Sequence, residues 1–342
     1  MALHLATAAQ PITRTALRWQ RIDSFRLYAI LLIVWGHIQL LSTIHGAGPI
    51  AKIAELTLAI GARFTMPFFF ILAGYFTGGK IAREPSKAVS VARAYTARLA
   101  VVFLFWCFIY ALEQPQNFLN LVREQPIKFI FEGSRPHLWF LVSLILTVWL
   151  YALWPFHKSH KSFLALGAVL YVIGLLGGSY NVTPIGFDMH FNTRDGFFLS
   201  TLFFAIGVAF HNRMPRISKK MALGIAVGGL AIFSLEAFYL RIQWNLSPCC
   251  HDYLLGTIPF GVGVTLLALS RPDSSIDRLV GPYGQYTLGV YASHLLFMDL
   301  LEPVGSFVDP LVWQLVAPIP IFCLALLTSI ILARTPLRRV VI

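Results

Sequence analysis

The segment RLYAILLIVWGH, from Arg26 to His37, places two chemically active side chains in an otherwise apolar run. The two residues are 11 positions apart, which in an α-helix is three turns plus about 20°, so both leave the same face. They are separated by about 16 Å along the axis, close to the length of an extended pantetheine arm. A guanidinium suits phosphate because its donors are forked, and an imidazole can act as general base or nucleophile. The pair therefore predicts phosphate binding at one end of a helix and group transfer at the other.

Charged residues just before Arg26, and others at the start of a later apolar segment, are consistent with phosphate binding. A charge in an apolar segment is costly, so it usually faces a protein interior or a wet cavity. Asp23 lies one turn before Arg26 and is placed to orient its guanidinium. Arg98, at the start of a later apolar segment, and Arg93 just before it are candidate phosphate partners. The alternative is that these arginines only anchor helix ends at the membrane surface.

Other polar or aromatic residues within apolar segments form a second candidate set. Arg63 precedes Pro67, which is expected to kink the helix; the alternative is an arginine that extends to the interface. Tyr291 and His294 are three positions apart and share a helix face, whereas Trp139 equally fits an aromatic belt. The residues that we expect to bind or support the acceptor are Asp23, Arg63, Trp139, Glu236, Tyr291 and His294.

The elements that must position these side chains are apolar helices. The chain of 342 residues is 57% hydrophobic and 12% charged, whereas soluble domains have roughly 45–50% apolar and about 25% charged residues. Apolar runs of about 20 residues recur along its whole length. We therefore expect an all-α, polytopic integral membrane protein with about ten transmembrane helices. The expected spans are 24–44, 53–76, 95–112, 137–156, 162–178, 196–211, 220–240, 253–270, 282–301 and 311–333.

The distribution of lysine and arginine orients these spans. With the N-terminus placed inside, 19 of the 27 basic residues fall in cytoplasmic segments and six in outer ones. The net charge of +12 then reflects this bias, and no nucleic-acid partner is expected. We predict one domain, 1–342, with a cytoplasmic N-terminal segment, 1–22, and a short cytoplasmic tail, 334–342. The first apolar run is expected to be retained as a helix, since no cleavage site follows it closely. We expect a multi-pass protein of the inner (plasma) membrane.

Sequence motifs for metals and nucleotides are not apparent. The four cysteines form no CxxC pair and the histidines are scattered, so we expect no metal site and no disulfide framework. No P-loop, GxSxG, HExxH or GxGxxG motif stands out. We therefore expect no permanently bound cofactor.

Several segments, taken in order, resemble the signature of the membrane acyltransferase-3 superfamily. The R-x10-H pattern is the first of them, and the form VWGH with FTMPFFFILAGYF looks most like the branch related to fucose 4-O-acetylase. The resemblance covers nearly the whole chain. The other matching segments are MPFFFILAGYF (66–76), HLWFLVSLIL (137–146), FFAIG (203–207) and LGVYASHLLF (288–297).

This resemblance implies transfer of an acyl group, usually acetyl, from cytoplasmic acyl-CoA to a sugar hydroxyl outside or within the membrane. The family's catalytic histidine carries over as His37, and its essential arginine as Arg26. Of the family's arginine pair before the third span, Arg98 fits, but Tyr95 stands where the partner is expected. Thr65 replaces the histidine that related sequences have before MP. No appended hydrolase-like domain is expected, so the membrane domain would perform the whole reaction.

The favoured hypothesis is a membrane O-acyltransferase. Acetyl-CoA or another acyl-CoA is the expected co-substrate, and the expected partners are a carbohydrate or lipid-linked glycan and the lipid bilayer. His37 would act either as general base or as acyl carrier. One alternative is a transporter or exporter of a glycan or acylated metabolite, since buried charges also suit a transport path, although no internal repeat is seen. The other is a membrane sensor or scaffold in which the charges are structural.

Overall fold

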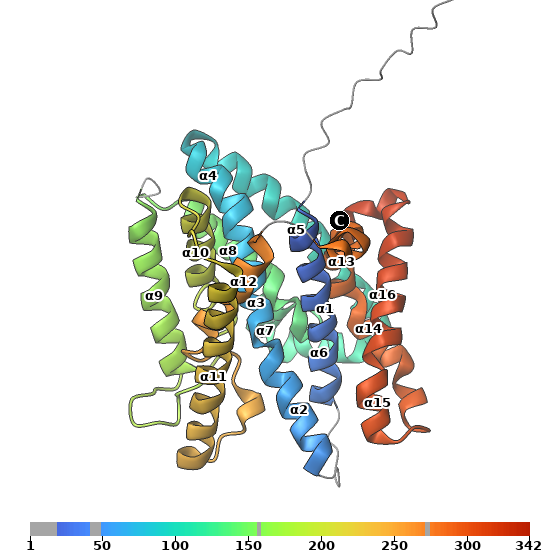
Figure 1. Ribbon diagram of the computed structural model, residues 1–342. Helices are drawn as coiled ribbons and strands as arrows, with labels where there is room; N and C mark the ends of the chain where they lie inside the picture. The colour runs from blue at the N-terminus through green and yellow to red at the C-terminus, as the bar shows by residue number, and fades with distance from the viewer. Residues whose placement is uncertain (1–18, 42–48, 156–158, 271–273) are drawn as a thin grey trace, which may run out of the picture.

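The computed structural model describes residues 19–41, 49–155, 159–270 and 274–342. These residues form helices joined by turns and short loops, and no strand occurs among them. Most of the long helices run roughly side by side in one bundle, with α1 near its middle (Figure 1). An all-helical fold, as expected from the apolar runs, is confirmed.

Each expected span contains a helix. The elements of the first half, within and between the expected spans, are α1 (Gln20–Leu41), α2 (Pro49–Gly61), η1 (Ala62–Phe64), α3 (Thr65–Ala73), the π-helical turn η2 (Gly74–Gly78), α4 (Gly79–Arg83), η3 (Pro85–Lys87), α5 (Ala88–Glu113), α6 (Pro115–Glu124), α7 (Pro126–Glu132), η4 (Pro136–Leu138) and α8 (Trp139–Ala152). In the second half they are α9 (His160–Gly177), α10 (Ser200–Asn212), α11 (Lys219–Trp244), η5 (Pro248–Cys250), α12 (Thr257–Leu269), α13 (Ser275–Val280), η6 (Gly281–Tyr286), α14 (Thr287–Gly305), α15 (Pro310–Val316), α16 (Pro318–Ala333) and η7 (Pro336–Val340).

Fewer of these helices are long enough to cross a bilayer unaided. In the described part of the chain, five helices have the length and apolar composition of a span, or six if α7 and α8, bent by 63°, count as one. By contrast, α10 and α12 have 13 residues each, or about 20 Å, against a hydrocarbon core of about 30 Å. The protein is therefore a multi-pass membrane protein, while the count of about ten spans and the side of each terminus stay predictions.

The helical run Leu56–Arg83 is interrupted twice where it passes the site. The 3-10 turn η1 contains Arg63, and the π-helical turn η2 begins at Gly74. A Cβ at Gly74 would lie 2.0 Å from the carbonyl oxygen of Phe204, and a Cβ at Gly207 would lie 2.0 Å from that of Ile71. Glycines on both helices thus let α3 and η2 pack directly on the backbone of α10.

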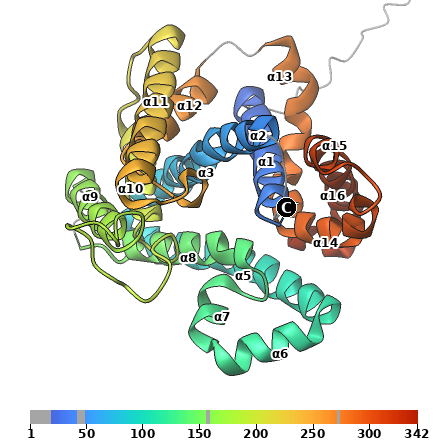
Figure 2. The same ribbon diagram turned by 90° about the horizontal axis from the view of Figure 1, so that it is seen from below.

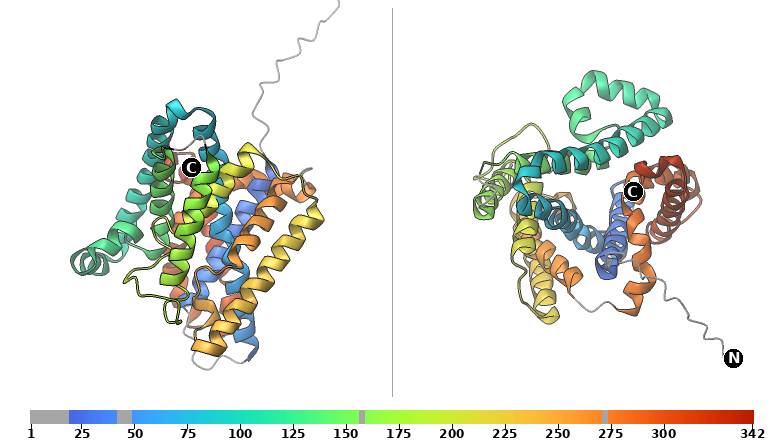
Figure 3. Two further views of the ribbon diagram at one scale, coloured as in Figure 1. Left: turned by 90° about the vertical axis from the view of Figure 1, so that its left-hand side faces the viewer. Right: turned by 90° about the horizontal axis from the view of Figure 1, so that it is seen from above.

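Helix α1 is packed on several sides, by η6, α13, α14, α16, α3 and α12. Ala29, Ile30 and Val34 are buried in these contacts, which orients Arg26 and His37 within the bundle. Figure 2 shows α1 between α3 and α14, whereas α6 and α7 extend away from the bundle (Figures 2 and 3). The helix that carries the R-x10-H pattern therefore has neighbours around most of its circumference.

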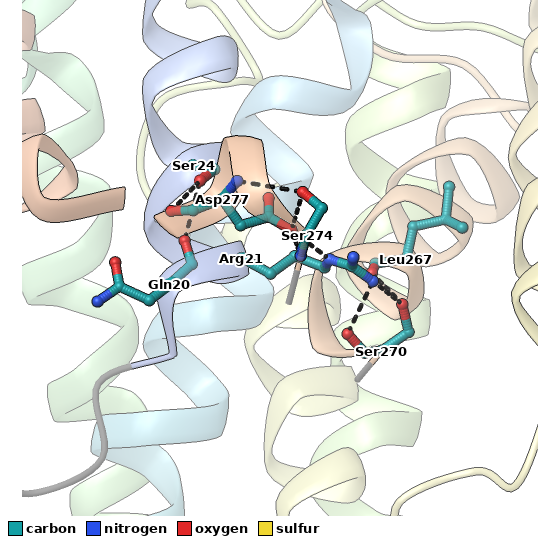
Figure 4. Close-up of polar contacts among 7 residues, drawn as sticks. All are labelled: Gln20, Arg21, Ser24, Leu267, Ser270, Ser274 and Asp277. Carbon is teal, nitrogen blue, oxygen red and sulfur yellow. Dashed lines mark hydrogen bonds and ion pairs between the residues drawn. The ribbon is translucent and has the colours of Figure 1, made fainter. Parts of the chain in front are cut away.

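The start of α1 is joined to the region around α13 by a polar network (Figure 4). Arg21 contacts Asp277 at 3.0 Å and donates a hydrogen bond of 3.1 Å to the carbonyl of Ser270. The hydroxyl of Ser274 and the carboxylate of Asp277 form a capping box at the start of α13. The Arg21 and Asp277 side chains at its centre are only 13% and 6% exposed, and the network fixes the end of α1 that carries Arg26.

Candidate active site

Three histidine rings from distant parts of the sequence meet in the bundle. His37 comes from α1, His137 from η4 and His294 from α14. Ring centroids are 5.1 Å apart for His37 and His294, 5.0 Å for His137 and His294, and 6.2 Å for His37 and His137. We call these three residues the histidine cluster. His37 and His294 are predicted site residues that the fold brings together, whereas no role is predicted for His137 from the sequence.

Backbone carbonyls of α14 orient two of the rings. His294 Nδ1 lies 2.7 Å from the carbonyl oxygen of Tyr291, and His137 Nε2 lies 3.4 Å from that of Ala292. The Tyr291 hydroxyl in turn donates to the carbonyl oxygen of His137. With these nitrogens as donors, His294 Nε2 and His137 Nδ1 keep a lone pair, and both are buried with no hydrogen-bond partner among the described residues. Two nitrogens in the cluster are therefore free to accept a hydrogen bond.

His37 also lines a cavity of about 150 Å³, which we call the His37 cavity. Two predicted residues, Arg63 and Trp139, share its wall with His37. Arg194 and Asp252 lie there as well, and no role is predicted for them from the sequence. The complete lining is Ile33, Gly36, His37, Ala59, Ala62, Arg63, Thr65, Met66, Trp139, Arg194, Leu199, Cys249 and Asp252.

A network of ion pairs closes one side of the His37 cavity. Arg194 lies 3.4 Å from Asp252, 3.5 Å from Asp195 and 3.8 Å from Glu132. Arg63 approaches Asp252 to 3.6 Å. Burial raises the pKa of Asp195 to about 7, with Arg194 opposing the rise and Glu132 adding to it. The cavity therefore presents both cationic and anionic groups, and one carboxyl titrates near neutral pH.

Arg26 lines a second cavity, of about 330 Å³, which we call the Arg26 cavity. Its guanidinium lies 3.1 Å from the buried carboxylate of Asp23 and 5.9 Å from the ring centroid of Phe76. The orienting contact from Asp23 is therefore present. Arg98 and Lys80 bring two further cations to the cavity.

Lys80 is the one of these cations for which no site role is predicted from the sequence. Arg93, which was expected to join Arg26, is exposed and lines neither cavity. Arg93 lies five positions before Arg98 on α5, and five positions rotate a side chain by about 140° beyond a full turn, so the two leave different faces of the helix. The cation partners of Arg26 are thus Lys80 and Arg98.

The two cavities are separate. The 11-residue spacing places Arg26 and His37 on one helix face, but each lines its own cavity. Both cavities share Met66, and Tyr291 lines the Arg26 cavity while its hydroxyl contacts His137. Spacing alone misses this because it cannot show which side chains of α3, such as Met66, line the space beside α1. The R-x10-H pattern therefore runs alongside two cavities that have Met66 in common.

Glu236 has a supporting position outside both cavities. Its carboxylate accepts hydrogen bonds from the backbone N–H groups of Leu255 and Gly256, at 3.1 and 3.2 Å, and from the Tyr180 hydroxyl. These contacts satisfy backbone donors at the turn that leads into α12. Glu236 therefore holds this turn and does not contact the His37 cavity.

The described residues contain no group of three or more His, Cys, Asp or Glu arranged to hold a metal ion. The side chains of the histidine cluster can act in acid–base and nucleophilic chemistry. The cations of the Arg26 cavity can bind an anion, and the His37 cavity offers both cationic and anionic groups to a second substrate.

Comparison with known proteins gives one matching family model and relatives that are longer than this chain. Residues 19–334 match the family model described as "Acyltransferase domain". An "Amino-acid racemase" of Enterococcus faecalis is 24% identical over 334 residues, which cover 92% of this chain and 45% of that protein. A "Serine/alanine racemase" of Enterococcus gallinarum is 30% identical over 244 residues, or 64% of this chain and 33% of that protein. The chain therefore spans less than half the length of these relatives. No solved structure matches.

Proposed function

The chain belongs to the acyltransferase-3 family, and from that membership we propose that it transfers an acyl group from acyl-CoA to a hydroxyl group. The observation that carries the proposal is the position of the histidine cluster: His37 lines the cavity of mixed charge, and Tyr291, which contacts His137, lines the cation-lined cavity. An enzyme with two unlike substrates needs such a division. We propose acetyl as the acyl group, and the inner (plasma) membrane as the location.

The Arg26 cavity is the proposed donor site. Arg26, Lys80 and Arg98 are three cations among its lining residues, and the diphosphate of CoA is a matching anion. The excess of basic residues at this end of the helices supports a cytoplasmic opening, where acyl-CoA is available. The pantetheine arm would follow the apolar wall formed by Phe69 and Phe140 toward Met66.

Met66 is the proposed gate between the two cavities. Methionine is unbranched and flexible, so its side chain can move aside at little cost. The thioester would then reach the histidine cluster from the Arg26 cavity while the acceptor occupies the His37 cavity. Closure behind the substrates would exclude water from the thioester.

In the direct mechanism, the imidazole of His37 removes the proton of the acceptor hydroxyl as its oxygen attacks the thioester carbonyl. The tetrahedral intermediate then collapses, its C–S bond breaks, and the CoA sulfur receives the proton from His37. In the stepwise mechanism, a ring nitrogen of His37 attacks the thioester carbonyl, the C–S bond breaks, and CoA leaves as a thiol with the proton of the other ring nitrogen. The acceptor hydroxyl then attacks the acyl-imidazole, the N–acyl bond breaks, and the hydroxyl proton returns to His37. Either route benefits from the nearby Nε2 of His294, which can accept a hydrogen bond from the His37 ring.

The acceptor proposed for the His37 cavity is a hydroxyl of a glycan or lipid-linked sugar. Trp139 provides an aromatic face for the C–H surface of a sugar ring, and Asp252 can accept hydrogen bonds from its hydroxyls. A cavity of about 150 Å³ has room for one ring of such a chain. Arg63 and Arg194 would also suit an acceptor that carries a carboxylate.

A second candidate function is transport. Two cavities that have Met66 in common also describe a substrate path with a gate. The names of the relatives concern amino acids, so serine or alanine is the cargo to test. Transport requires substrate movement across a sealed membrane without release of CoA from acetyl-CoA.

The deciding experiment uses the full chain in nanodiscs with acetyl-CoA labelled in the acetyl group. CoA release and labelled product are measured with a glycan fraction of the cell envelope as acceptor. We expect His37→Ala to reduce transfer by about a hundred-fold or more, while His160→Ala, at the distant start of α9, leaves it unchanged. Absence of CoA release and of any labelled product with the unmodified protein would reject the acyltransferase proposal. Uptake of labelled serine into proteoliposomes tests the second candidate.

A further inference from the structure

Three arginines converge on a groove beside the proposed donor site. Arg98 of α5 and Arg338 and Arg339 of η7 line a groove of about 510 Å³ together with Ala97, Val101 and Ile342. No carboxylate side chain is among these lining residues. Within the described part of the chain, no hydrogen bond or ion pair joins the three guanidinium groups to other residues. By contrast, Arg21, Arg26 and Arg194 each contact a carboxylate. We call this groove the arginine groove.

Buried contacts, and not chance proximity, hold η7 against α5. Val340 and Val341 are buried. The indole N–H of Trp106 on α5 donates to the carbonyl of Val340 at 3.1 Å, and the N–H of Gly289 on α14 donates to that of Val341, also at 3.1 Å. A Cβ at Gly289 would lie 2.7 Å from the Cβ of Val341. The fold thus fixes a segment whose neighbouring arginines line the same groove as Arg98.

The three arginines are exposed, and no carboxylate side chain lines the groove, so an anion bound among them would be attracted by all three charges. The phosphomonoester is the biological anion that fits best. It carries a charge of about −1.5 to −2 near neutral pH and has three acceptor oxygens. The forked guanidinium groups of arginine bind such oxygens in pairs.

The arginine groove adjoins the Arg26 cavity at one residue, since Arg98 lines both. The proposed donor carries two separate phosphate groups, the diphosphate and a monoester on the 3′ position of its ribose. We propose that Arg338 and Arg339, with Arg98, bind the 3′-phosphate of acyl-CoA, while Arg26 and Lys80 bind the diphosphate. This inference rests on the proposed function, because it assumes that acyl-CoA occupies the Arg26 cavity.

The same chemistry has a second source in the membrane. Val101 and Leu337 beside the groove are 43% and 44% exposed, so the phosphate of an anionic lipid headgroup could also reach the three arginines. The two sources differ in what they respond to. The 3′-phosphate belongs to the donor, whereas the lipid phosphate depends on the composition of the bilayer.

The test compares acetyl-CoA with acetyl-dephospho-CoA, which lacks only the 3′-phosphate. For the unmodified protein in nanodiscs, we expect a KM for the dephospho donor about ten-fold or more above that for acetyl-CoA, with little change in kcat. The double variant Arg338→Gln with Arg339→Gln should raise the KM for acetyl-CoA to the same degree. It should leave the KM for the dephospho donor unchanged, so that discrimination between the donors disappears.

The matched control is the double variant Arg213→Gln with Arg216→Gln, which removes the same charge from exposed positions away from the groove. It should keep the discrimination. Equal KM values for the two donors with the unmodified protein would overturn the proposal. It would also be overturned if the effect of Arg338→Gln with Arg339→Gln changed with the fraction of anionic lipid and not with the donor. That result would assign the groove to a lipid phosphate.

Direct binding separates this inference from the proposed function. Adenosine 3′,5′-bisphosphate and adenosine 5′-monophosphate are titrated onto the unmodified protein and the groove variant, with no acyl transfer involved. Tighter binding of the bisphosphate, lost in the groove variant, would support the phosphate site even if no transfer is detected. Equal binding of both nucleotides would overturn the site even if transfer is robust.

Discussion

The close approach of η6 to α1 leads to a quantitative expectation for Gly284→Ala. A Cβ at Gly284 would lie 2.5 Å from both the Cβ and the carbonyl oxygen of Asp23, whereas ordinary contacts are 3.4–4 Å. The two segments must therefore separate by about 1 Å, which typically costs about 1–3 kcal/mol in overpacking. The displaced residue is Asp23, whose carboxylate contacts Arg26 at 3.1 Å.

This displacement should appear in donor binding more than in chemistry. A charge-assisted hydrogen bond to phosphate contributes about 1.5–3 kcal/mol, so misplacing Arg26 should raise the KM for acetyl-CoA about ten- to hundred-fold. The kcat should change little, because none of the three histidines of the cluster lines the Arg26 cavity. Steady-state kinetics in nanodiscs give both values, and thermal unfolding reports the packing cost.

Gly224→Ala on α11 is the matched control, since nothing lies within 4 Å of a Cβ at that position. An alanine there should stabilise the helix by about 0.5–1 kcal/mol and leave the kinetics unchanged. A KM for acetyl-CoA in the Gly284 variant that equals the KM of the control would refute the reasoning. The packing of η6 would then not position Arg26.

Two further outcomes follow from the histidine cluster and the ion-pair network. His294→Leu removes the nitrogen that can accept a hydrogen bond from the His37 ring, so we expect kcat to fall about a hundred-fold with little change in KM for acetyl-CoA; an unchanged kcat would exclude a role of His294 in orienting His37. Burial raises the pKa of Asp195 to about 7, so the folded protein keeps a proton that the unfolded chain loses near pH 4. Its free energy of unfolding should then fall as pH rises from about 4 to about 7. Asp195→Asn should flatten that slope in thermal unfolding between pH 5 and 8, and an identical slope in the variant would contradict the assignment.

The sequence by itself determined the elements and one reactive face. Helicity follows from apolar runs that leave no other way to satisfy backbone hydrogen bonds in lipid. The shared face of Arg26 and His37 follows from helical periodicity within one segment. The contact of Asp23 with Arg26 is local for the same reason, since residues three apart are neighbours on a helix. Each of these predictions depends only on distances along the chain.

Tertiary structure alone decided which residues join that face. His137 and Arg194 approach the site from positions about 100 and 157 residues beyond His37, and no periodicity relates such separations. The same holds for Arg338 and Arg339. They line one groove with Arg98 only because buried valines dock η7 on α5 and α14. Met66 lines both cavities as a result of packing as well, because this depends on how closely α3 lies beside α1. Periodicity within one helix gives the direction of a side chain, but the neighbours that complete a site are set by how separate helices pack.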